Sequence, residues 1–245
     1  MPVTASPEVV AQLAPDGVLR AGINMSNFLL VSGRTAAGGP AGVAPDMASA
    51  VAERLGVAIE HVPYPRPGEL ADAAGTGAWG IGLIGAEPQR AEKIAFTAAY
   101  AEIEATYLVP AGSPIRTLDE VDRPGIRIAV TARAAYDLWL ERNIRRATLV
   151  RSESLDAAVK QFTDEKLEVL AGLRPRLLTD IESMPGARIL DGKFMAVQQA
   201  IGTHRPNAAA AKFLAAFVEE AKATGLVAAL IARHGIRGLS VAPAA

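Results

Sequence analysis

Arginine and glutamate side chains are the groups in this chain whose type and position could serve chemistry. Arg90 lies just after Pro88 in the first turn of a predicted helix, where backbone N–H groups favour anions. Its guanidinium is a planar fork that can bind a carboxylate through two parallel hydrogen bonds, which Lys cannot do. The alternative is a solvated arginine that pairs with Glu87 or Glu92, and the residues alone favour that alternative.

Other kinds of reactive site lack support in the sequence. The chain has no Cys, which excludes disulfides, zinc–thiolate sites and thiol catalysis. Its 3 histidines lie far apart and lack metal-ligand spacing, so we expect no metal site. The glycine-rich run 80–85 lacks both the Lys-Ser/Thr of a phosphate loop and the dinucleotide spacing. Glu87 and Glu104 are the candidate acid–base residues, but no motif ties them to a reaction, and we predict neither catalytic residues nor a cofactor.

Composition and charge limit the class of protein. Of 245 residues, 25 are Lys or Arg and 26 are Asp or Glu, and this balance gives no basic surface for nucleic acid or an anionic membrane. A hydrophobic content of 50% with 21% charged residues indicates a folded globular chain.

The N-terminal residues bear on the compartment. They lack the charged region and the apolar run of a secretory signal, and the apolar stretches elsewhere are shorter than the ~20 residues that span a bilayer. We expect a soluble protein that either lost a signal peptide or stays in the cytoplasm.

Predicted strands and helices alternate along the chain and must position these side chains. The predicted strands are 18–23, 57–62, 79–84, 127–130, 148–151, 167–171, 188–190 and 196–202, and a further strand ends with residues 107–109 before Pro110. The predicted helices are 47–55 with Gly56 as its C′ glycine, 70–74, 87–93, 118–121, 134–145, 155–162, 175–182, 207–224 and 226–234. Such alternation predicts an α/β fold with mainly parallel sheets and helices on both faces.

The pattern restarts near residue 110, which suggests two lobes rather than one continuous sheet. The sequence shows no charged or Ser/Gly-rich linker at this point. Lobes joined without a flexible linker usually meet across a cleft, which is a preferred place for ligands.

The order of these segments resembles a known family. The segments are 17–24, Pro45-Asp-Met-Ala, Arg54-Leu-Gly-Val, 87–97 and Tyr107-Leu-Val-Pro. In this order they resemble the family-3 extracellular solute-binding proteins, the receptors of polar-amino-acid ABC transporters. The resemblance runs from about Asp16 to Gly235, and its most specific part is Pro88-x-Arg90-x-x-x-Ile-x-Phe-Thr97.

The resemblance implies a type 2 periplasmic-binding-protein fold with a discontinuous chain. Residues 1–110 and 201–245 would form lobe 1, and residues 111–200 would form lobe 2. It also implies a periplasmic location, a permease partner and a ligand cleft between the lobes, and we expect a monomer. Arg90 matches the family's arginine that binds the carboxylate of the ligand.

The chain departs from the family's pattern at several binding positions. Leu173 stands where the family has an Asp that binds the α-amino group, and Arg174 follows it. Arg133, before Ala134, replaces a glycine of the lobe-2 anion loop. Three further differences concern lobe 1: Gly85 and Ala86 replace polar residues, and Asn27, with Phe28 beside it, replaces the covering aromatic residue. The predicted ligand-binding residues are Asn24, Asn27, Phe28, Gly85, Arg90, Glu104, Arg133, Ala134, Leu173 and Arg174.

These departures suggest a ligand without an α-ammonium group. The Asp is lost and Arg133 and Arg174 are gained, so we expect an organic, keto or aromatic acid with one or more carboxylates. In the alternative, both arginines point outward and the ammonium group of an amino acid binds Glu104 or Glu87.

The predicted function is that of a solute-binding protein of an ABC importer, in which two lobes close over a small carboxylate-bearing ligand. The alternatives are an enzyme on the same scaffold, similar to cyclohexadienyl dehydratases, and a cytoplasmic ligand sensor. An enzyme would need a positioned acid or base, for which Glu87 and Glu104 are the candidates.

Overall fold

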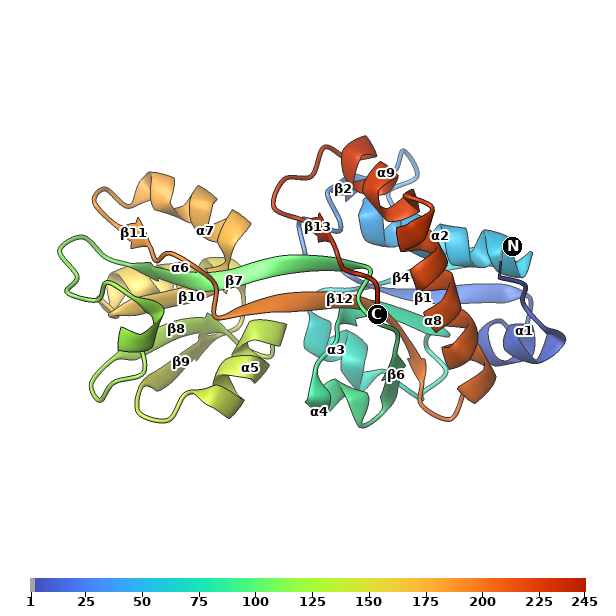
Figure 1. Cartoon of the computed structure of the whole chain (residues 1–245), viewed down its shortest axis with the longest axis horizontal. Coiled ribbons are helices and arrows are strands. Elements are labelled where there is room, and N and C mark those ends of the chain that lie inside the picture. Colours follow the sequence, from blue (N-terminus) through green and yellow to red (C-terminus); the bar gives the residue numbers. More distant parts are fainter. Residues whose placement is uncertain (1–2) are drawn as a thin grey trace. The chain divides into compact units, whose positions relative to one another are not determined.

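Two compact units make up the chain in the computed structural model, which describes residues 3–245 (Figure 1). Unit 1 contains the chain up to Glu102 and the segment Gln198–Ala245, and unit 2 contains Ile103–Val197. Two long strands, β7 (Ala101–Val109) and β12 (Met195–His204), carry the chain from one unit to the other. The predicted divisions at residues 110 and 200 lie later in the chain, because each strand continues through the unit boundary without a break.

Unit 1 holds the N- and C-terminal segments. Its helices are α1 (Pro7–Leu13), α2 (Val43–Leu55), α3 (Pro67–Asp72), α4 (Pro88–Ala91), α8 (Ala208–Ala223) and α9 (Leu226–Arg233). Its strands, besides parts of β7 and β12, are β1 (Val18–Asn24), β2 (Gly33–Arg34), β3 (Pro40–Ala41), β4 (Ala58–Tyr64), β5 (Ile81–Gly85), β6 (Ile94–Phe96) and β13 (Ser240–Val241).

The sheet of unit 1 has the strand order β4-β1-β5-β12. Strand β1 is parallel to both of its neighbours, with Val18 opposite Ala58 and Ala21 opposite Ile81. The chain therefore leaves β1 through α2 to reach β4 on one side, and returns through α3 to β5 on the other side. Strand β12 is antiparallel to β5, because it enters unit 1 from unit 2 rather than through a helical crossover.

Local sequence explains the limits of α2. Pro45 and Asp46 fit the first turn of this helix, so it begins at Val43, earlier than the predicted residue 47. It ends at Gly56, which takes the left-handed conformation at φ 70° as predicted for a C′ glycine.

Helix α8 packs against α1 and α9 (Figure 1). A core cluster of unit 1 contains Leu70, Ala74, Trp79, Ile84 and Ile94.

Unit 2 repeats the alternation of strands and helices. Its helices are the 3₁₀ helix η1 (Leu118–Glu120), α5 (Ala135–Asn143), α6 (Leu155–Asp164), α7 (Arg174–Asp180) and the 3₁₀ helix η2 (Ile181–Ser183). Its strands, besides parts of β7 and β12, are β8 (Arg127–Thr131), β9 (Thr148–Ser152), β10 (Val169–Leu173) and β11 (Arg188–Ile189).

The sheet of unit 2 has the strand order β7-β10-β8-β9. Strand β8 is parallel to β9 and to β10, and β7 is antiparallel to β10. The chain leaves β8 through α5 to reach β9, and then crosses back through α6 to β10 on the other side of β8. The core under this sheet contains Leu108, Ala129, Ala158, Phe162, Leu167, Leu170 and Leu177.

The predicted α/β fold class is confirmed, with parallel strands at the centre of each sheet. Three of the differences from the prediction lie in α1, α4 and β6. Helix α1 was not predicted, although Ser6 caps it by accepting from the N–H of Val9 and Pro7 occupies its first turn. Helix α4 ends at Ala91 instead of residue 93, because the chain turns into β6, which was also not predicted.

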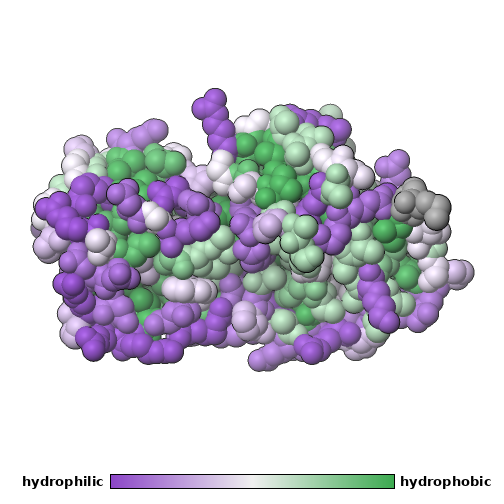
Figure 2. All heavy atoms as spheres, in the orientation of Figure 1, coloured by the Kyte–Doolittle hydropathy of each residue, from purple (hydrophilic) through white to green (hydrophobic). Residues whose placement is uncertain are grey.

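Hydrophilic residues cover much of the face seen in Figure 2, and hydrophobic residues gather in smaller patches between them. Among the large hydrophobic side chains of residues 3–245, the exposed ones are Leu178, at 54%, and Val241, at 37%. None of the helices in residues 3–245 combines the length and the apolar character that a membrane-spanning segment needs.

Candidate functional site

The carboxyl ends of the central parallel strands form one edge of the sheet in each unit. In an open α/β sheet, ligands bind at this edge. The binding point lies between two neighbouring strands whose following connections lead to opposite sides of the sheet. In unit 1 that point lies between β1 and β5, and in unit 2 between β8 and β10. Every predicted binding residue except Glu104 lies at the end of one of these four strands or in the segment that follows. Each unit therefore presents its predicted residues at the edge where ligands are expected.

The segment after β1 is built by its own asparagines. The Oδ1 atom of Asn24 accepts from the N–H of Ser26 at 3.2 Å and from its hydroxyl at 2.8 Å. The Oδ1 atom of Asn27 accepts from the N–H of Leu29 at 3.2 Å, and Asn27 is only 6% exposed. Phe28, which directly follows Asn27, is half-buried. Asn24 and Asn27, which were predicted to bind the ligand, thus also shape this loop through side-chain turns.

Arg90 is buried at the second strand end of unit 1. It is 6% exposed, and its Nη1 atom donates to the carbonyl oxygen of Gly85 at 2.7 Å. Gly85 ends β5, and the N–H of Ala86 donates to the carbonyl oxygen of Gln198 on β12. The strand end therefore fixes the orientation of the guanidinium. The predicted alternative of a solvated surface arginine does not describe this burial.

Two further residues of this segment that the sequence singled out, the acid–base candidate Glu87 and the last motif residue Thr97, are also buried. Glu87 is 5% exposed and precedes α4. Thr97 is 8% exposed, and its hydroxyl oxygen accepts from the N–H of Ile201 on β12 at 3.2 Å. The Phe96-Thr97 end of the motif therefore attaches the segment after α4 to β12, which holds Arg90's segment in place.

The segment after β8 in unit 2 has an unusual backbone. Arg133 lies in the left-handed region at φ 60°, where a residue with a Cβ is disfavoured. Its N–H donates to Oδ2 of Asp137 at 2.7 Å, and Oδ1 of Asp137 accepts from Nε of Arg151 at 2.8 Å. Burial raises the pKa of Asp137, and the bonds from Arg133 and Arg151 oppose that rise. Ala134 is the N-cap residue of α5, and the Arg133 side chain is exposed.

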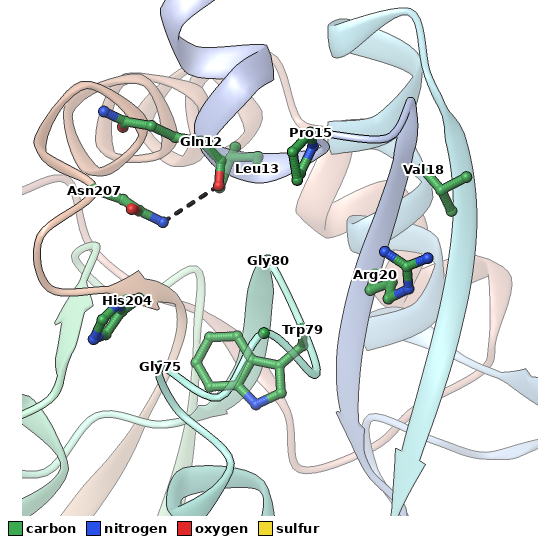
Figure 3. Close-up of a pocket in the computed structure, with 11 residues that line it drawn as sticks. Gln12, Leu13, Pro15, Val18, Arg20, Gly75, Trp79, Gly80, His204 and Asn207 are labelled. Atoms are coloured by element: carbon green, nitrogen blue, oxygen red, sulfur yellow. Dashed lines mark hydrogen bonds between the residues drawn. The ribbon is translucent and has the colours of Figure 1, made fainter.

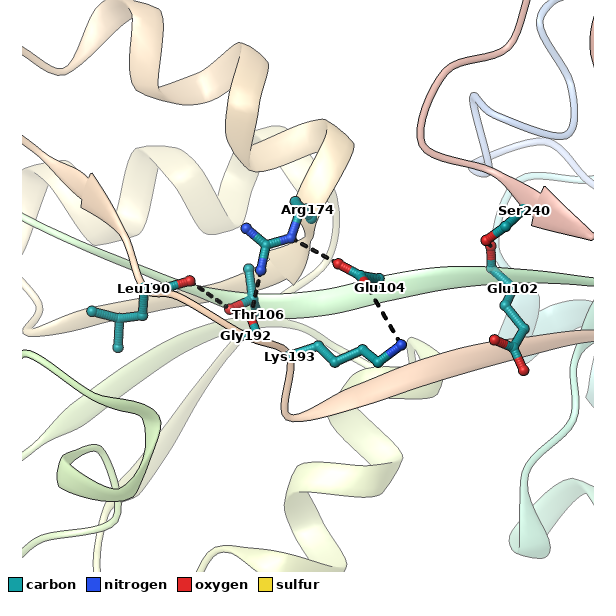
Figure 4. Close-up of polar contacts among 8 residues, drawn as sticks. All are labelled: Glu102, Glu104, Thr106, Arg174, Leu190, Gly192, Lys193 and Ser240. Carbon is teal, nitrogen blue, oxygen red and sulfur yellow. Dashed lines mark hydrogen bonds and ion pairs between the residues drawn. The ribbon is translucent and has the colours of Figure 1, made fainter. Parts of the chain in front are cut away.

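The segment after β10 contains an ion cluster (Figure 4). Nε of Arg174 donates to Oε2 of Glu104 at 3.0 Å, and Nζ of Lys193 lies 3.4 Å from Oε1 of the same carboxylate. Nη2 of Arg174 also donates to the carbonyl oxygen of Gly192. We call Glu104, Arg174 and Lys193 the Glu104 cluster. Leu173, before Arg174, is 7% exposed and buries its side chain.

The charge state of Glu104 follows from its partners. Burial favours the neutral carboxyl group, but the hydrogen bonds from Arg174 and Lys193 outweigh it and lower the pKa of Glu104. An ionised carboxylate with both oxygens in contact with cations is a poor proton donor. The ammonium group of a ligand would have to compete with two cations for it.

The structure brings some of the predicted residues into contact. Gly85 contacts Arg90 in unit 1, and Glu104 contacts Arg174 in unit 2. Asp137 and Lys193 are additional residues at these edges. Asp137 is recognisable in the sequence only as an acid in the first turn of a predicted helix, and Lys193 carries no local signal. Residues 3–245 contain no group of three His, Asp or Glu side chains placed to hold a metal ion.

A pocket of about 230 Å³ lies at the opposite edge of the sheet in unit 1 (Figure 3). It is located where β1 begins and just before β5, and Trp79, Arg20 and His204 are among its lining residues. Nδ2 of Asn207 donates to the carbonyl oxygen of Gln12 across it at 3.4 Å. A second pocket, of about 330 Å³, lies in unit 2 near Phe162 and Met184. Neither pocket contains a predicted binding residue.

A model of the bacterial extracellular solute-binding proteins, family 3, matches residues 19–236. No curated protein matches the sequence. The matched residues include both strand-end regions of unit 1 and all of unit 2.

Solved structures resemble the whole chain at low identity. An amino acid ABC transporter substrate-binding protein from Streptococcus pneumoniae, bound to L-arginine, has a TM-score of 0.73 at 17% identity, covering 96% of this chain and 99% of that one. The ancestral amino acid-binding protein AncCDT-1, a precursor of cyclohexadienyl dehydratase, has a TM-score of 0.74 at 17% identity, covering 93% and 99%. A histidine kinase sensor domain with similarity to periplasmic binding proteins has a TM-score of 0.74 at 15% identity, covering 92% and 98%. These likenesses confirm the predicted periplasmic-binding-protein fold.

Proposed function

Because the chain belongs to the bacterial extracellular solute-binding proteins, family 3, we propose that it is the solute-binding protein of an ABC importer. In this proposal Arg90 binds a carboxylate of a small ligand, and the ligand stabilises a closed arrangement of the two units that a permease recognises. The protein would act as a monomer in the periplasm. Its ligand would be an amino acid or another small organic acid.

The observation that carries this proposal is the burial and orientation of Arg90. Its guanidinium is held by the carbonyl oxygen of Gly85 at the strand edge where α/β sheets bind ligands. A buried guanidinium is costly unless it is hydrogen-bonded, and a carboxylate matches its planar fork. The surrounding segment is attached to β12 through Thr97, which would help to hold the site in position before a ligand arrives.

The first prediction concerns the charge and shape of residue 90. In a thermal-shift and calorimetric screen against amino acids and small organic acids, at least one carboxylate should stabilise the wild-type protein in a concentration-dependent manner. Arg90→Lys keeps the charge but loses the fork, and should weaken binding of that compound by about tenfold or more. Arg90→Ala should abolish the shift.

Arg20→Ala and Arg20→Lys serve as matched controls. Arg20 lies near the beginning of β1, at the other edge of the same sheet, and pairs with Asp16 and Glu60. Its variants should bind the ligand like the wild type. Circular dichroism of the Arg90 variants separates lost binding from lost folding. Unchanged affinity in a folded Arg90→Ala protein would show that the assignment is wrong.

An enzyme on the same scaffold is the rival function, because AncCDT-1 is described as a precursor of a dehydratase. Glu104 and Glu87 are the acids available in the two edge regions. The Glu104 cluster supports binding over catalysis, because a carboxylate with a lowered pKa and two cationic partners is a weak base. Turnover of a cyclic acid such as prephenate that disappears in Glu104→Gln would favour the enzyme.

A ligand sensor is the other rival, because a histidine kinase sensor domain shares the fold. Fold similarity does not separate a transport receptor from a sensor. Ligand-dependent binding to a permease in proteoliposomes would support transport, and the absence of any such binding would favour the sensor.

A further inference from the structure

We propose that unit 2 contributes an anion-binding subsite, so that the ligand carries a second acidic group in place of an α-ammonium group. The subsite consists of Arg174 and Lys193 of the Glu104 cluster, with Arg133 in the segment after the neighbouring strand. This inference rests on the proposed function, because it concerns the ligand whose first carboxylate Arg90 would bind.

The position of the subsite follows from the strand order of unit 2. Strands β8 and β10 are parallel neighbours, and their crossovers leave in opposite directions. Arg133 lies in the segment after β8, and Arg174 directly follows β10. Neighbouring strands lie about 4.8 Å apart, so the two arginines arise from adjacent points on the ligand-binding edge.

The Glu104 cluster carries a net positive charge. Both carboxylate oxygens of Glu104 contact a cation: Oε2 contacts Arg174 and Oε1 contacts Lys193 (Figure 4). Two positive charges face one negative charge, and the Arg174 and Lys193 side chains remain 27% and 46% exposed. The cluster would therefore attract an anion and repel an ammonium group.

The guanidinium of Arg174 is preorganised for such an anion. Its Nε and Nη2 atoms donate to Glu104 and to the carbonyl oxygen of Gly192, which fixes the plane of the group. Thr106 donates to the same carbonyl oxygen at 2.9 Å and holds that turn. The remaining terminal nitrogen, Nη1, donates to no other residue in the described part of the chain. It can bind an acidic group without a loss of rotamer freedom.

The other acids of this edge do not offer an ammonium site. Asp137 is 2% exposed, and its two oxygens accept from Arg133 and Arg151. Leu173, at the end of β10, is apolar and buried. Glu153 is exposed, but it follows the edge strand β9. It therefore does not lie between β8 and β10, where ligands are expected.

The test compares dicarboxylates with matched monocarboxylates by isothermal titration calorimetry. The probes are succinate, glutarate and adipate, each beside the monocarboxylate of equal chain length, together with neutral, acidic and basic L-amino acids. We expect one dicarboxylate to bind the wild-type protein about tenfold or more tightly than its monocarboxylate partner, and more tightly than any neutral amino acid. In Arg174→Gln this ratio should fall towards one.

Two further variants make the result specific. Glu104→Gln removes the negative charge of the cluster and should raise the ratio of dicarboxylate to monocarboxylate affinity. Arg146→Gln is the matched control, because Arg146 is exposed and precedes β9 at the other edge of unit 2. If Arg174→Gln does not fold, the opposite effect of Glu104→Gln and a steeper loss of dicarboxylate affinity with added salt carry the test.

Failure of this inference differs from failure of the proposed function. Arg90-dependent binding of monocarboxylates or neutral amino acids that matches or exceeds dicarboxylate binding would overturn the subsite and leave the proposed function intact. An Arg174→Gln protein with an unchanged dicarboxylate preference would do the same. If no carboxylate in the panel binds, the proposed function itself is overturned.

Discussion

Arg133 and Gly42 illustrate how a single backbone conformation limits the residue that can occupy a position. Arg133 adopts φ 60° despite its Cβ, and the bond from its N–H to Asp137 compensates part of the cost of about 1 kcal/mol. Gly42 adopts φ 148° before α2, and no Cβ fits there. The strained residue Arg133 lies at the proposed subsite, whereas Gly42 is the N-cap residue of α2.

The glycines on either side of α2 give a prediction at this scale. A Cβ at Gly42 would lie 2.4 Å from the carbonyl oxygen of Leu30, whereas a Cβ at Gly56 would meet no atom within 4 Å. Gly56→Ala should destabilise by about 1 kcal/mol from backbone strain alone. Gly42→Ala adds a backbone clash and should cost about 3 kcal/mol or more. Urea denaturation measures both, and equal losses would contradict the steric reasoning.

Among the elements, helices α2 and α8 are joined by an ion pair that also holds the N-terminal segment. Nη2 of Arg54 lies 2.7 Å from Oε1 of Glu220, and Oε2 of Glu220 accepts from the N–H of Val3 at 2.7 Å. The hydrogen bonds from Arg54 and Val3 lower the pKa of Glu220 from 4.5 to about 2. A carboxyl with a lowered pKa stabilises the fold above its unfolded pKa.

This pairing predicts a pH dependence for Glu220→Gln. The variant should be less stable than the wild type at pH 7, because the stabilising charge is lost. The difference should shrink as pH falls from 4.5 towards 2, since the wild-type carboxyl becomes protonated over that window. Glu53→Gln, an exposed position on α2, should change little at any pH. Denaturant midpoints across pH measure the effect, and a pH-independent difference would show that the charge is not its cause.

The order and type of most elements could be predicted because their signals are local. The spacing of Met47, Val51 and Leu55 with the glycine that follows predicted α2, and only its start differs. Helix α1 could have been predicted from Ser6 and Pro7, which form an N-cap signature. The three residues of β6 carry no such signal, because pairing with β12 rather than local periodicity makes them a strand.

For the whole molecule, the feature that matters is that each unit has a core of its own. Leu70 is fully buried in unit 1, and Leu170 is 2% exposed in unit 2. Elements with separate cores can open separately, so local stability need not be uniform along the chain.

Two matched core substitutions test this independence. Leu170→Ala should destabilise unit 2 by about 2–5 kcal/mol and raise hydrogen exchange within residues 103–197. Leu70→Ala should instead raise exchange in residues 3–102 and 198–245. Mass spectrometry of exchanged peptides separates the two responses. Faster exchange in both units for either variant would show that the chain unfolds as one cooperative body.

Local patterns in the sequence determined the α/β alternation, and the resemblance of the segment order to a known family pointed to Arg90 and to the candidate arginines of the second unit. The tertiary structure alone decided which charges meet. Glu104 and Arg174 are 70 residues apart, and Arg54 and Glu220 are 166 apart. Strand order and helix packing bring them together, and neither is encoded in local periodicity. The pairing of charges around the candidate site was therefore decided only when the strands were placed side by side.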